Sequence, residues 1–353
     1  MKICYIANAA NYHTVKWVKH FVNLGNEVHV ISYSKAKIKG AHVHYINFRL
    51  KNFPFKAHIV HKLIKDLNPD ILHAQQANTC GFYATTTKNF SPIVSAWGSD
   101  ILVDPDKSFL MKKIIQYVLK HSYCITSDSN YMSKKIIKLG GNKNKILTFP
   151  MGIENDLVNF KHEYNFVRNE IHILSYRRLE KLYNIDIIIK GFSKALNNHK
   201  NLYLDIAADG SEYNNLKNLV KSLNIQNHVN FIGKFERKDL GNMIINNDIF
   251  ISIPSSDSTS VSLLETMCCG VFPIVSNLPA NLEWITNKKN GIVLNSINEN
   301  NVCASIEWCI KNYNYLSEAS KINMELIRKK ALWENNIKII EDLYNKLYSL
   351  NAH

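Results

Sequence analysis

Two carboxylates and a run of hydroxyl side chains lie close together in the segment 249–275. Asp257 and Glu265 are eight positions apart, with an apolar run before them and a short helical pattern around Glu265. The hydroxyl side chains between them are Ser258, Thr259, Ser260 and Ser262. Backbone N–H groups at the start of a helix bind phosphate, and a carboxylate can accept hydrogen bonds from two sugar hydroxyls. The segment therefore predicts a site for a nucleoside diphosphate that carries a sugar.

Parallel sheets are the elements that would position these residues, because short apolar runs alternate with amphipathic segments along the chain. The expected strands are 2–7, 28–33, 71–74, 93–97, 123–127, 146–149, 171–176, 202–207, 229–233, 249–253 and 272–275. The expected helices are 13–24, 55–67, 79–88, 109–121, 130–139, 185–196, 211–223, 238–246, 261–268 and 301–313. A chain of 353 residues suits two domains rather than one core. We expect an α/β fold of two Rossmann-like, doubly wound domains, 1–155 and 156–330, that face a central cleft. Residues 331–353 are expected to form a helix that packs back towards the first domain.

Composition narrows the classes of partner and the compartment. Hydrophobic residues make up 46% of the chain, and no apolar run reaches the roughly 20 residues that span a bilayer. The seven cysteines are scattered, which indicates a reducing, cytoplasmic compartment. The net charge is +14, and Glu27 and Asp66 are the only acids among the first 68 residues. Either a basic background or attachment to an anionic membrane surface on the inner face explains this charge. Nucleic acid is not expected, since no basic stripe with interleaved aromatic residues occurs.

Six landmarks appear in the order found in one enzyme family. The segment from Asp257 to Glu265 resembles the E-x7-E signature of retaining, GT-B-fold glycosyltransferases of family 4, also called glycosyl transferases group 1. The other similar segments are 69–74, 149–153, 175–180, 206–210 and 229–233. The resemblance covers nearly the whole chain, and six matches in order are far more specific than any one of them. It implies that residues 1–155 bind the acceptor and residues 156–330 bind the nucleotide-sugar.

The resemblance also implies the reaction and the donor-binding residues. A sugar would pass from a UDP- or GDP-linked donor to a saccharide or lipid-linked saccharide acceptor with retention of configuration, in surface polysaccharide or glycan biosynthesis. Glu265 would bind ribose hydroxyls, and Asp257 would hold hydroxyls of the transferred sugar. Arg177 or Arg178 would grip the diphosphate and stabilise its charge, with help from Lys181. The remaining donor-side candidates are Ser258, Thr259, Ser260, Gly210 and Gly233.

Acceptor-side candidates lie after the expected strands of the first domain. Asp100 would orient the acceptor hydroxyl or the sugar, and it counts with Asp257 and Arg177 as a catalytic candidate. The other candidates are His13, His73, Trp97 and Ser99. A structural role for His73 and a buried position for Trp97 are the alternatives. No metal or other cofactor is expected, because basic side chains and helix N-termini would neutralise the leaving diphosphate.

The sequence departs from the family pattern at several places, and two other functions stay open. The first acid is Asp257 instead of Glu, and the loop after it carries hydroxyls instead of glycines. Tyr183 lies near the position where the family has a phosphate-binding lysine. These departures leave room for a nucleotide-sugar epimerase of GT-B architecture or for a non-catalytic saccharide-binding homologue. Front-side attack is the preferred route to retention, and Asp257 as a covalent nucleophile is the alternative.

Overall fold

The computed structural model describes residues 1–48, 53–165 and 169–351. Residues 352 and 353, at the end of the expected C-terminal segment, lie outside the described residues. The chain divides into two compact units. Unit 1 is Met1–Phe149 together with Ile337–His353, and unit 2 is Pro150–Asn336. No helix among the described residues has both the length and the apolar character needed to cross a membrane.

Unit 1 is built on a parallel sheet with the order β3-β2-β1-β4-β5-β6-β7. Its strands are β1 (Lys2–Ile6), β2 (Glu27–Ser32), β3 (His42–Tyr45), β4 (Ile71–Gln75), β5 (Ile93–Ser95), β6 (Cys124–Ser127) and β7 (Ile146–Thr148). Its helices are α1 (Tyr12–Asn23), α2 (Phe53–Leu67), α3 (Thr79–Thr86), α4 (Ser99–Leu102), α5 (Asp104–Lys107), α6 (Phe109–His121), α7 (Asn130–Lys138) and α15 (Lys338–Asn351).

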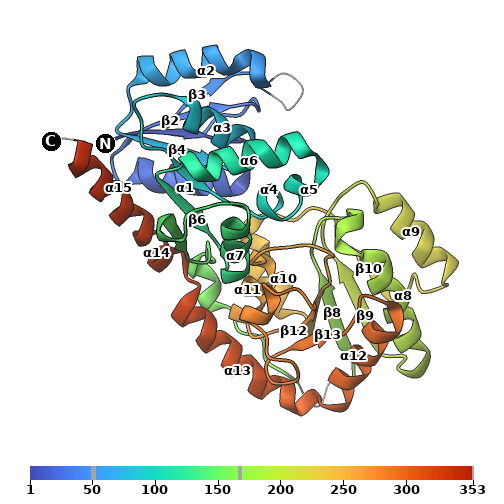
Figure 1. Cartoon of the computed structure of the whole chain (residues 1–353). Coiled ribbons are helices and arrows are strands. Elements are labelled where there is room, and N and C mark those ends of the chain that lie inside the picture. The colour runs from blue at the N-terminus through green and yellow to red at the C-terminus, as the bar shows by residue number, and fades with distance from the viewer. Residues whose placement is uncertain (49–52, 166–168, 352–353) are drawn as a thin grey trace. The chain divides into compact units, whose positions relative to one another are not determined.

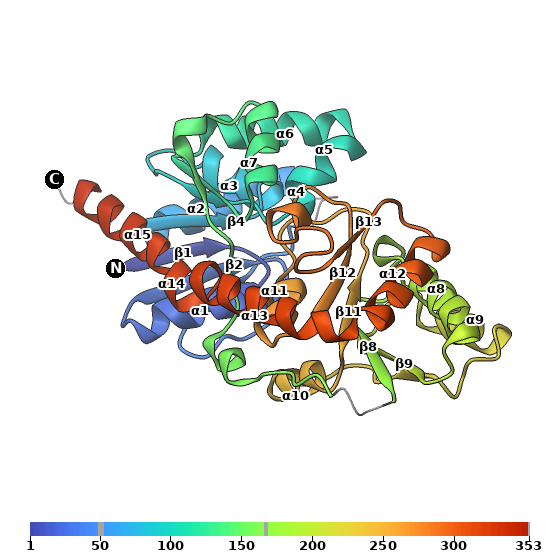
Figure 2. The same cartoon turned by 90° about the horizontal axis from the view of Figure 1, so that it is seen from below.

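Alternating side chains divide the helices of unit 1 between the two faces of the sheet. Cys4 and Ile6 of β1 belong to one buried cluster with residues of α2, α3, α6 and α7. Tyr5, between them, points to the other face, where its hydroxyl lies 3.1 Å from that of Tyr344 in α15. The Tyr344 ring also packs on Phe21 of α1 at 4.7 Å between centroids. Figure 2 shows α6 and α7 on one side of the strands of unit 1 and α1 on the other.

Unit 2 is built on a second parallel sheet with the order β10-β9-β8-β11-β12-β13. Most of its strands are labelled in Figure 1. Its strands are β8 (Ile171–Ser175), β9 (Leu202–Ile206), β10 (Val229–Phe231), β11 (Ile249–Ser252), β12 (Phe272–Ser276) and β13 (Ile292–Leu294). Its helices are α8 (Ile185–Asn198), α9 (Tyr213–Ser222), α10 (Leu240–Ile245), α11 (Val261–Cys268), α12 (Glu299–Lys311), α13 (Tyr313–Lys330) and α14 (Trp333–Asn336). Helices α8, α9 and α12 share one buried cluster, and α10 and α11 share another.

These sheets confirm the expected fold class of two Rossmann-like α/β domains. Both sheets are parallel throughout their described strands, and helices cover both faces, as in doubly wound folds. The structure adds two strands that the sequence pattern did not predict, β3 and β13, two short helices, α4 and α5, and the long helix α13. The helix expected at 331–353 is divided into α14 and α15 in the described residues.

Candidate active site

The strand order of unit 2 reverses at β8, which locates the candidate site. Strands β9 and β10 follow β8 on one side, whereas β11 lies on its other side. Ligands bind in open α/β sheets where the strand order reverses, outside the carboxyl ends of the strands. Arg177 follows the end of β8, and Asp257 follows the end of β11. The two sequence-predicted residues thus belong to the pair of loops where this fold places a ligand.

Arg177 joins these two loops. Its Nη2 donates to Asp257 Oδ2 at 2.7 Å, and its Nη1 donates to the hydroxyls of Ser260 and Ser262. The guanidinium carbon also lies 4.6 Å from the ring centroid of Tyr183, in cation–π geometry. Burial disfavours the charge on Arg177, but Asp257 and Tyr183 outweigh it and raise the pKa of the guanidinium above its ordinary value. Arg177 is therefore a fixed positive charge beside the first predicted carboxylate.

The hydroxyl loop leads directly into α11. Ser260 is the N-cap of this helix, and its Oγ accepts a hydrogen bond from the Leu263 N–H at 3.4 Å. The Ser258 N–H donates to Oδ1 of Asp257 at 3.0 Å, so the loop folds back on the carboxylate. Ser258 is buried, and Thr259 is half-buried. The loop thus holds Asp257 in place and presents the N-terminus of an eight-residue helix.

Glu265 lies one turn into α11 and is only 8% exposed. Its Oε1 accepts a hydrogen bond from Nη1 of Arg237 at 2.5 Å, and its Oε2 accepts one from the Tyr176 hydroxyl at 3.2 Å. Burial, followed by the nearby charge of Glu265, raises the pKa of Tyr176 well above its usual value, so the phenol stays a hydrogen-bond donor. Arg237 also pairs with Glu154 and Asp156, each at 3.5 Å. Glu265 therefore has a fixed orientation.

Tyr176 and Arg237 are site residues that the sequence reasoning missed. Tyr176 directly precedes Arg177, so consecutive residues at the end of β8 contact the two predicted carboxylates. Its position inside the similar segment 175–180 was a usable signal. Arg237 comes from a short 3-10 helix, Arg237–Asp239, after β10, in a run of charged residues without a motif. No local pattern marks it as a partner of Glu265.

Arg178 and Lys181 lie outside this cluster. The Arg178 side chain is 74% exposed, and it lies 3.8 Å from the Glu180 carboxylate in an ion pair. Lys181 is exposed and lines a pocket of about 340 Å³ together with Glu180 and Glu212. Glu180 itself accepts hydrogen bonds from the N–H and hydroxyl of Ser211 at 3.2 and 2.6 Å. The structure thus links Arg177, Asp257 and Glu265 through neighbouring residues. It leaves Arg178 and Lys181 at the surface.

Gly210 and Gly233 require glycine for different structural reasons. A Cβ on Gly210 would lie 2.3 Å from the carbonyl oxygen of Leu179, so this position packs the loop after β9 against the loop after β8. Gly233 has φ +77° and open space around it, so its requirement is a backbone conformation that L-residues rarely adopt. Neither observation by itself identifies a nucleotide contact.

Asp100 in unit 1, expected to orient the acceptor hydroxyl, is fully buried. Its Oδ2 accepts a hydrogen bond from the Ala77 N–H at 2.7 Å, and its Oδ1 accepts one from the Trp97 N–H at 3.0 Å. Burial raises the pKa of Asp100 to about 6. Ala77 follows β4 and Trp97 follows β5, so the carboxylate fixes two loops at the end of the sheet. Its contacts in this structure are structural ones.

His73 is also fully buried, in a polar chain that reaches α15. Its Nδ1 lies 2.5 Å from the Tyr344 hydroxyl, and its Nε2 lies 2.7 Å from the Ser95 hydroxyl. Burial lowers the pKa of His73 to about 3, so the ring is neutral at physiological pH. His73 therefore fits the structural role that was the alternative to a role in acceptor binding, because both of its ring nitrogens already face hydrogen-bonding partners.

His13, Trp97 and Ser99 lie at the same edge of the unit 1 sheet. The rings of His13 and Trp97 meet edge to face, with 6.0 Å between centroids, and both side chains are partly exposed. Ser99 is exposed at the start of α4. These residues follow β1 and β5, close to the point where the strand order of unit 1 reverses between β1 and β4. They form the acceptor-side candidates that a ligand can reach.

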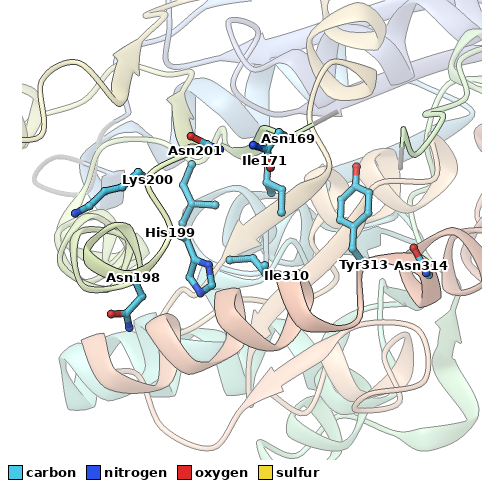
Figure 3. A pocket seen from close by; sticks show the side chains of 10 residues that line it. Asn169, Ile171, Asn198, His199, Lys200, Asn201, Ile310, Tyr313 and Asn314 are labelled. Atoms are coloured by element: carbon cyan, nitrogen blue, oxygen red, sulfur yellow. The ribbon is translucent and has the colours of Figure 1, made fainter. Parts of the chain in front are cut away.

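A further surface pocket lies at the opposite edge of the unit 2 sheet (Figure 3). It has a volume of about 470 Å³, and Ile171 and Leu202, the first residues of β8 and β9, line it together with Lys200 and Tyr313. Because Arg177 and Asp257 follow the carboxyl ends of their strands, this pocket is separate from their site. Within 1–48, 53–165 and 169–351, no group of three His, Cys, Asp or Glu side chains is arranged to hold a metal ion. The expectation that no metal is needed stays a prediction.

Comparisons with known proteins identify the family. Residues 2–129 match the model of glycosyl transferase 4-like proteins, and residues 159–325 match that of glycosyl transferases group 1. N-acetyl-alpha-D-glucosaminyl L-malate synthase of Bacillus anthracis is 24% identical over 221 residues, which cover 58% of this chain and 55% of that protein. This match therefore spans about half the length of the Bacillus relative.

Two further proteins match along most of the chain. The N,N'-diacetylbacillosaminyl-diphospho-undecaprenol alpha-1,3-N-acetylgalactosaminyltransferase of Campylobacter jejuni is 24% identical over 349 residues, 92% of this chain and 86% of that protein. An Anabaena protein solved in complex with UDP and glucose superposes with a TM-score of 0.81 at 15% identity, covering 97% of this chain and 99% of that chain. Taken with the two family matches, these results show that the chain belongs to the glycosyl transferases group 1 and has the GT-B fold.

Proposed function

We propose that this glycosyltransferase moves a sugar from a UDP- or GDP-linked donor to a saccharide or lipid-linked saccharide, with retention of configuration, in surface polysaccharide or glycan biosynthesis. One observation carries the proposal. Arg177 and Asp257 form an ion pair beside α11, and Glu265 lies one turn into the same helix. The Anabaena structure, solved with UDP and glucose, favours UDP as the first nucleotide to test. The Campylobacter relative, an undecaprenol-linked saccharide transferase by name, favours a lipid-linked acceptor.

Glu265 binds the ribose in this proposal. Its carboxylate can accept hydrogen bonds from both hydroxyls of a vicinal diol, because a carboxylate has about four acceptor positions. Tyr176 and Arg237 orient it before the donor arrives. Such preorganisation lowers the cost of binding, since the ligand does not have to order the side chain.

Arg177 and the start of α11 stabilise the diphosphate. Free N–H groups and the positive end of the helix dipole favour an anion at this terminus. The guanidinium of Arg177 lies at the same terminus, because it donates to the hydroxyls of Ser260 and Ser262. A fixed cation stabilises the negative charge that develops on the leaving diphosphate without reorganising during the reaction. Arg178 and Lys181 contribute from the surface.

Asp257 holds hydroxyls of the transferred sugar and keeps its charge paired with Arg177. A carboxylate at 2.7 Å from a guanidinium is stabilised as the anion, which makes it a poorer nucleophile. We therefore favour front-side attack, in which the acceptor oxygen forms the new bond to the anomeric carbon. The bond from that carbon to the diphosphate breaks on the same face, and a diphosphate oxygen takes the acceptor proton. On the acceptor side, His13 and Trp97 provide ring surfaces for a sugar, and Asp100 fixes the loop that carries Trp97.

Ligand binding and turnover test this proposal together. Calorimetry with UDP, GDP and their sugar conjugates should show a donor that binds the wild-type chain, and donor consumption should require an added acceptor. Conversion of the donor without any acceptor would instead support the epimerase alternative. Binding of a saccharide without binding of any nucleoside diphosphate would support the non-catalytic homologue and contradict the assigned site.

A further inference from the structure

Exposed apolar side chains gather on two helices of unit 1. Phe55 in α2 is 77% exposed, and in α6 Phe109 is 76% and Leu110 is 68% exposed. Ile59 and Tyr117 add further exposed apolar surface on α2 and α6. Both helices already bury another face against the sheet, so these residues are not needed for the core. Large apolar side chains that cluster at a surface mark interaction sites more often than isolated ones do.

The two helices belong to one layer. Helix α3 contacts both of them, because His61 of α2 lies 2.9 Å from the Thr86 hydroxyl and Phe82 packs on Tyr117 of α6 at 6.5 Å between centroids. Helices α2, α3 and α6, labelled in Figure 1, cover the same face of the sheet. Each of α2 and α6 leads into a parallel strand, β4 and β6, so both start at the edge where the strands end. The exposed residues at their starts therefore lie at the edge of the sheet that carries the acceptor-side candidates.

Positive charge surrounds these apolar side chains. Helix α6 contains three lysines and no acid, and Asp66 is the one acid of α2. The lysines of α6 are Lys112, Lys113 and Lys120, and none of them forms an ion pair with a carboxylate of the described residues. Lys113 Nζ lies 5.3 Å from the Phe109 ring centroid, so cation and apolar surface are adjacent. On the preceding α5, Asp104 pairs with Lys107 at 2.8 Å, and Asp106 is exposed.

We propose that the outer face of α2, α3 and α6, the basic apolar face, docks on an anionic lipid bilayer. Phe55, Phe109 and Leu110 enter the boundary between headgroups and acyl chains, and the lysines meet the headgroup phosphates. A second copy of the chain is a poorer occupant, because it would bring the same unpaired lysines against each other. This inference rests on the proposed function, since a bilayer at this edge would deliver a lipid-linked acceptor towards His13 and Trp97.

Sedimentation with lipid vesicles tests the proposal on the full chain. The wild type should bind phosphatidylglycerol vesicles at low salt, bind phosphatidylcholine vesicles weakly, and lose binding at high salt as the charges are screened. Phe109→Ser with Leu110→Ser should weaken binding about tenfold or more, because it removes the inserted apolar surface. Lys112→Glu with Lys113→Glu should weaken it about tenfold or more. The matched control reverses two exposed lysines of α9, Lys217→Glu with Lys221→Glu, and should bind like the wild type.

The outcomes separate this inference from the proposed function. All changed side chains are exposed, so thermal unfolding and calorimetry with UDP should be unchanged in every variant. Absence of wild-type binding at low salt, or an equal loss in the control and test variants, would overturn the docking surface. Wild-type self-association that Phe109→Ser with Leu110→Ser abolishes would instead assign the face to a second copy. Failure of UDP to bind would contradict the proposed donor site. It would not change the conclusion that the vesicle experiment gives about the docking surface.

Discussion

Replacing Glu265 by Gln should separate donor binding from folding. The amide keeps the size of the side chain, but it has one acceptor oxygen where the carboxylate had two. Arg237 donates to Oε1 and Tyr176 donates to Oε2, so the amide oxygen can keep only one of these two hydrogen bonds, although Tyr176 still donates to the Ser262 carbonyl at 2.7 Å. Arg237 retains Glu154 and Asp156 at 3.5 Å, and no unpaired cation is left behind. The expected loss of folding stability is therefore about 0.5–1.5 kcal/mol, the net contribution of one hydrogen bond whose donor keeps another acceptor.

Donor binding should lose more free energy than folding does. A hydrogen bond to a charged group contributes about 1.5–3 kcal/mol, and the neutral amide cannot accept from both ribose hydroxyls while it also accepts from Arg237. Loss of one such bond corresponds to about a ten- to hundredfold rise in the Kd for UDP, at about 1.4 kcal/mol for each factor of ten. Because the lost contact is to the nucleotide, the KM for the donor should rise in parallel.

Calorimetry with UDP and chemical unfolding measure the two effects on the same preparations. Glu318→Gln is the matched control, since this glutamate is exposed on α13, and it should leave both quantities unchanged. A folded Glu265→Gln chain that binds UDP with wild-type affinity would refute the assignment of Glu265 to the ribose. An unfolded variant would show instead that the carboxylate is mainly structural.

Three further changes have definite expectations. Arg177→Lys should lower kcat about a hundredfold in a transfer assay while the fold persists, because a lysine cannot replace a planar guanidinium; Arg328→Lys, at an exposed position of α13, is its control. Asp100→Ala should cost about 2–6 kcal/mol in urea unfolding, since two buried N–H groups lose their acceptor. Burial raises the pKa of Asp100 from 3.8 to about 6, so its stabilising contribution is full below pH 3.8 and falls as the pH rises through 6. The gap between wild type and Asp100→Ala should therefore narrow by about 3 kcal/mol from pH 4 to 7, and a constant gap would contradict this linkage. Gly210→Ala should lower the melting temperature, because its Cβ would meet the Leu179 carbonyl, and a neutral result would show that the loop adapts.

Strong periodicity made most elements predictable, and weak or short patterns hid most of the others. The expected helix 109–121 has the observed bounds of α6, because its apolar positions repeat every three to four residues. Strand β3, His42–Tyr45, was missed because histidines alternate with its apolar residues and all four side chains keep some exposure. Strand β13, Ile292–Leu294, has three residues, which is too few for a periodic signal. Helices α4 and α5 are single turns, and their patterns are equally short.

In the candidate site, too, the sequence predicted some residues and did not reveal others. Asp257 and Glu265 were recognisable because one loop and one helix carry both, so their spacing is a local property of the sequence. Their partners are not local: Tyr176 is 89 positions from Glu265, and Arg237 is 28 positions from it. Burial is a second property that residue type does not reveal. Asp100 was found as a carboxylate at the end of a strand, but only the packed loops show that backbone N–H groups take both of its oxygens.

The return of α15 to unit 1 has a consequence for biosynthesis. The Tyr344 hydroxyl completes the hydrogen bonding of His73, a residue that leaves the ribosome more than two hundred positions earlier. Until residues 337–351 emerge, the side of the nascent first sheet that α1 covers would lack the Tyr344 ring that packs on Phe21, and the His73 imidazole would lack one partner. Domains generally fold as units during translation. Here the second unit can complete its folding first. The first unit would stay accessible to chaperones until its last helix has been synthesised.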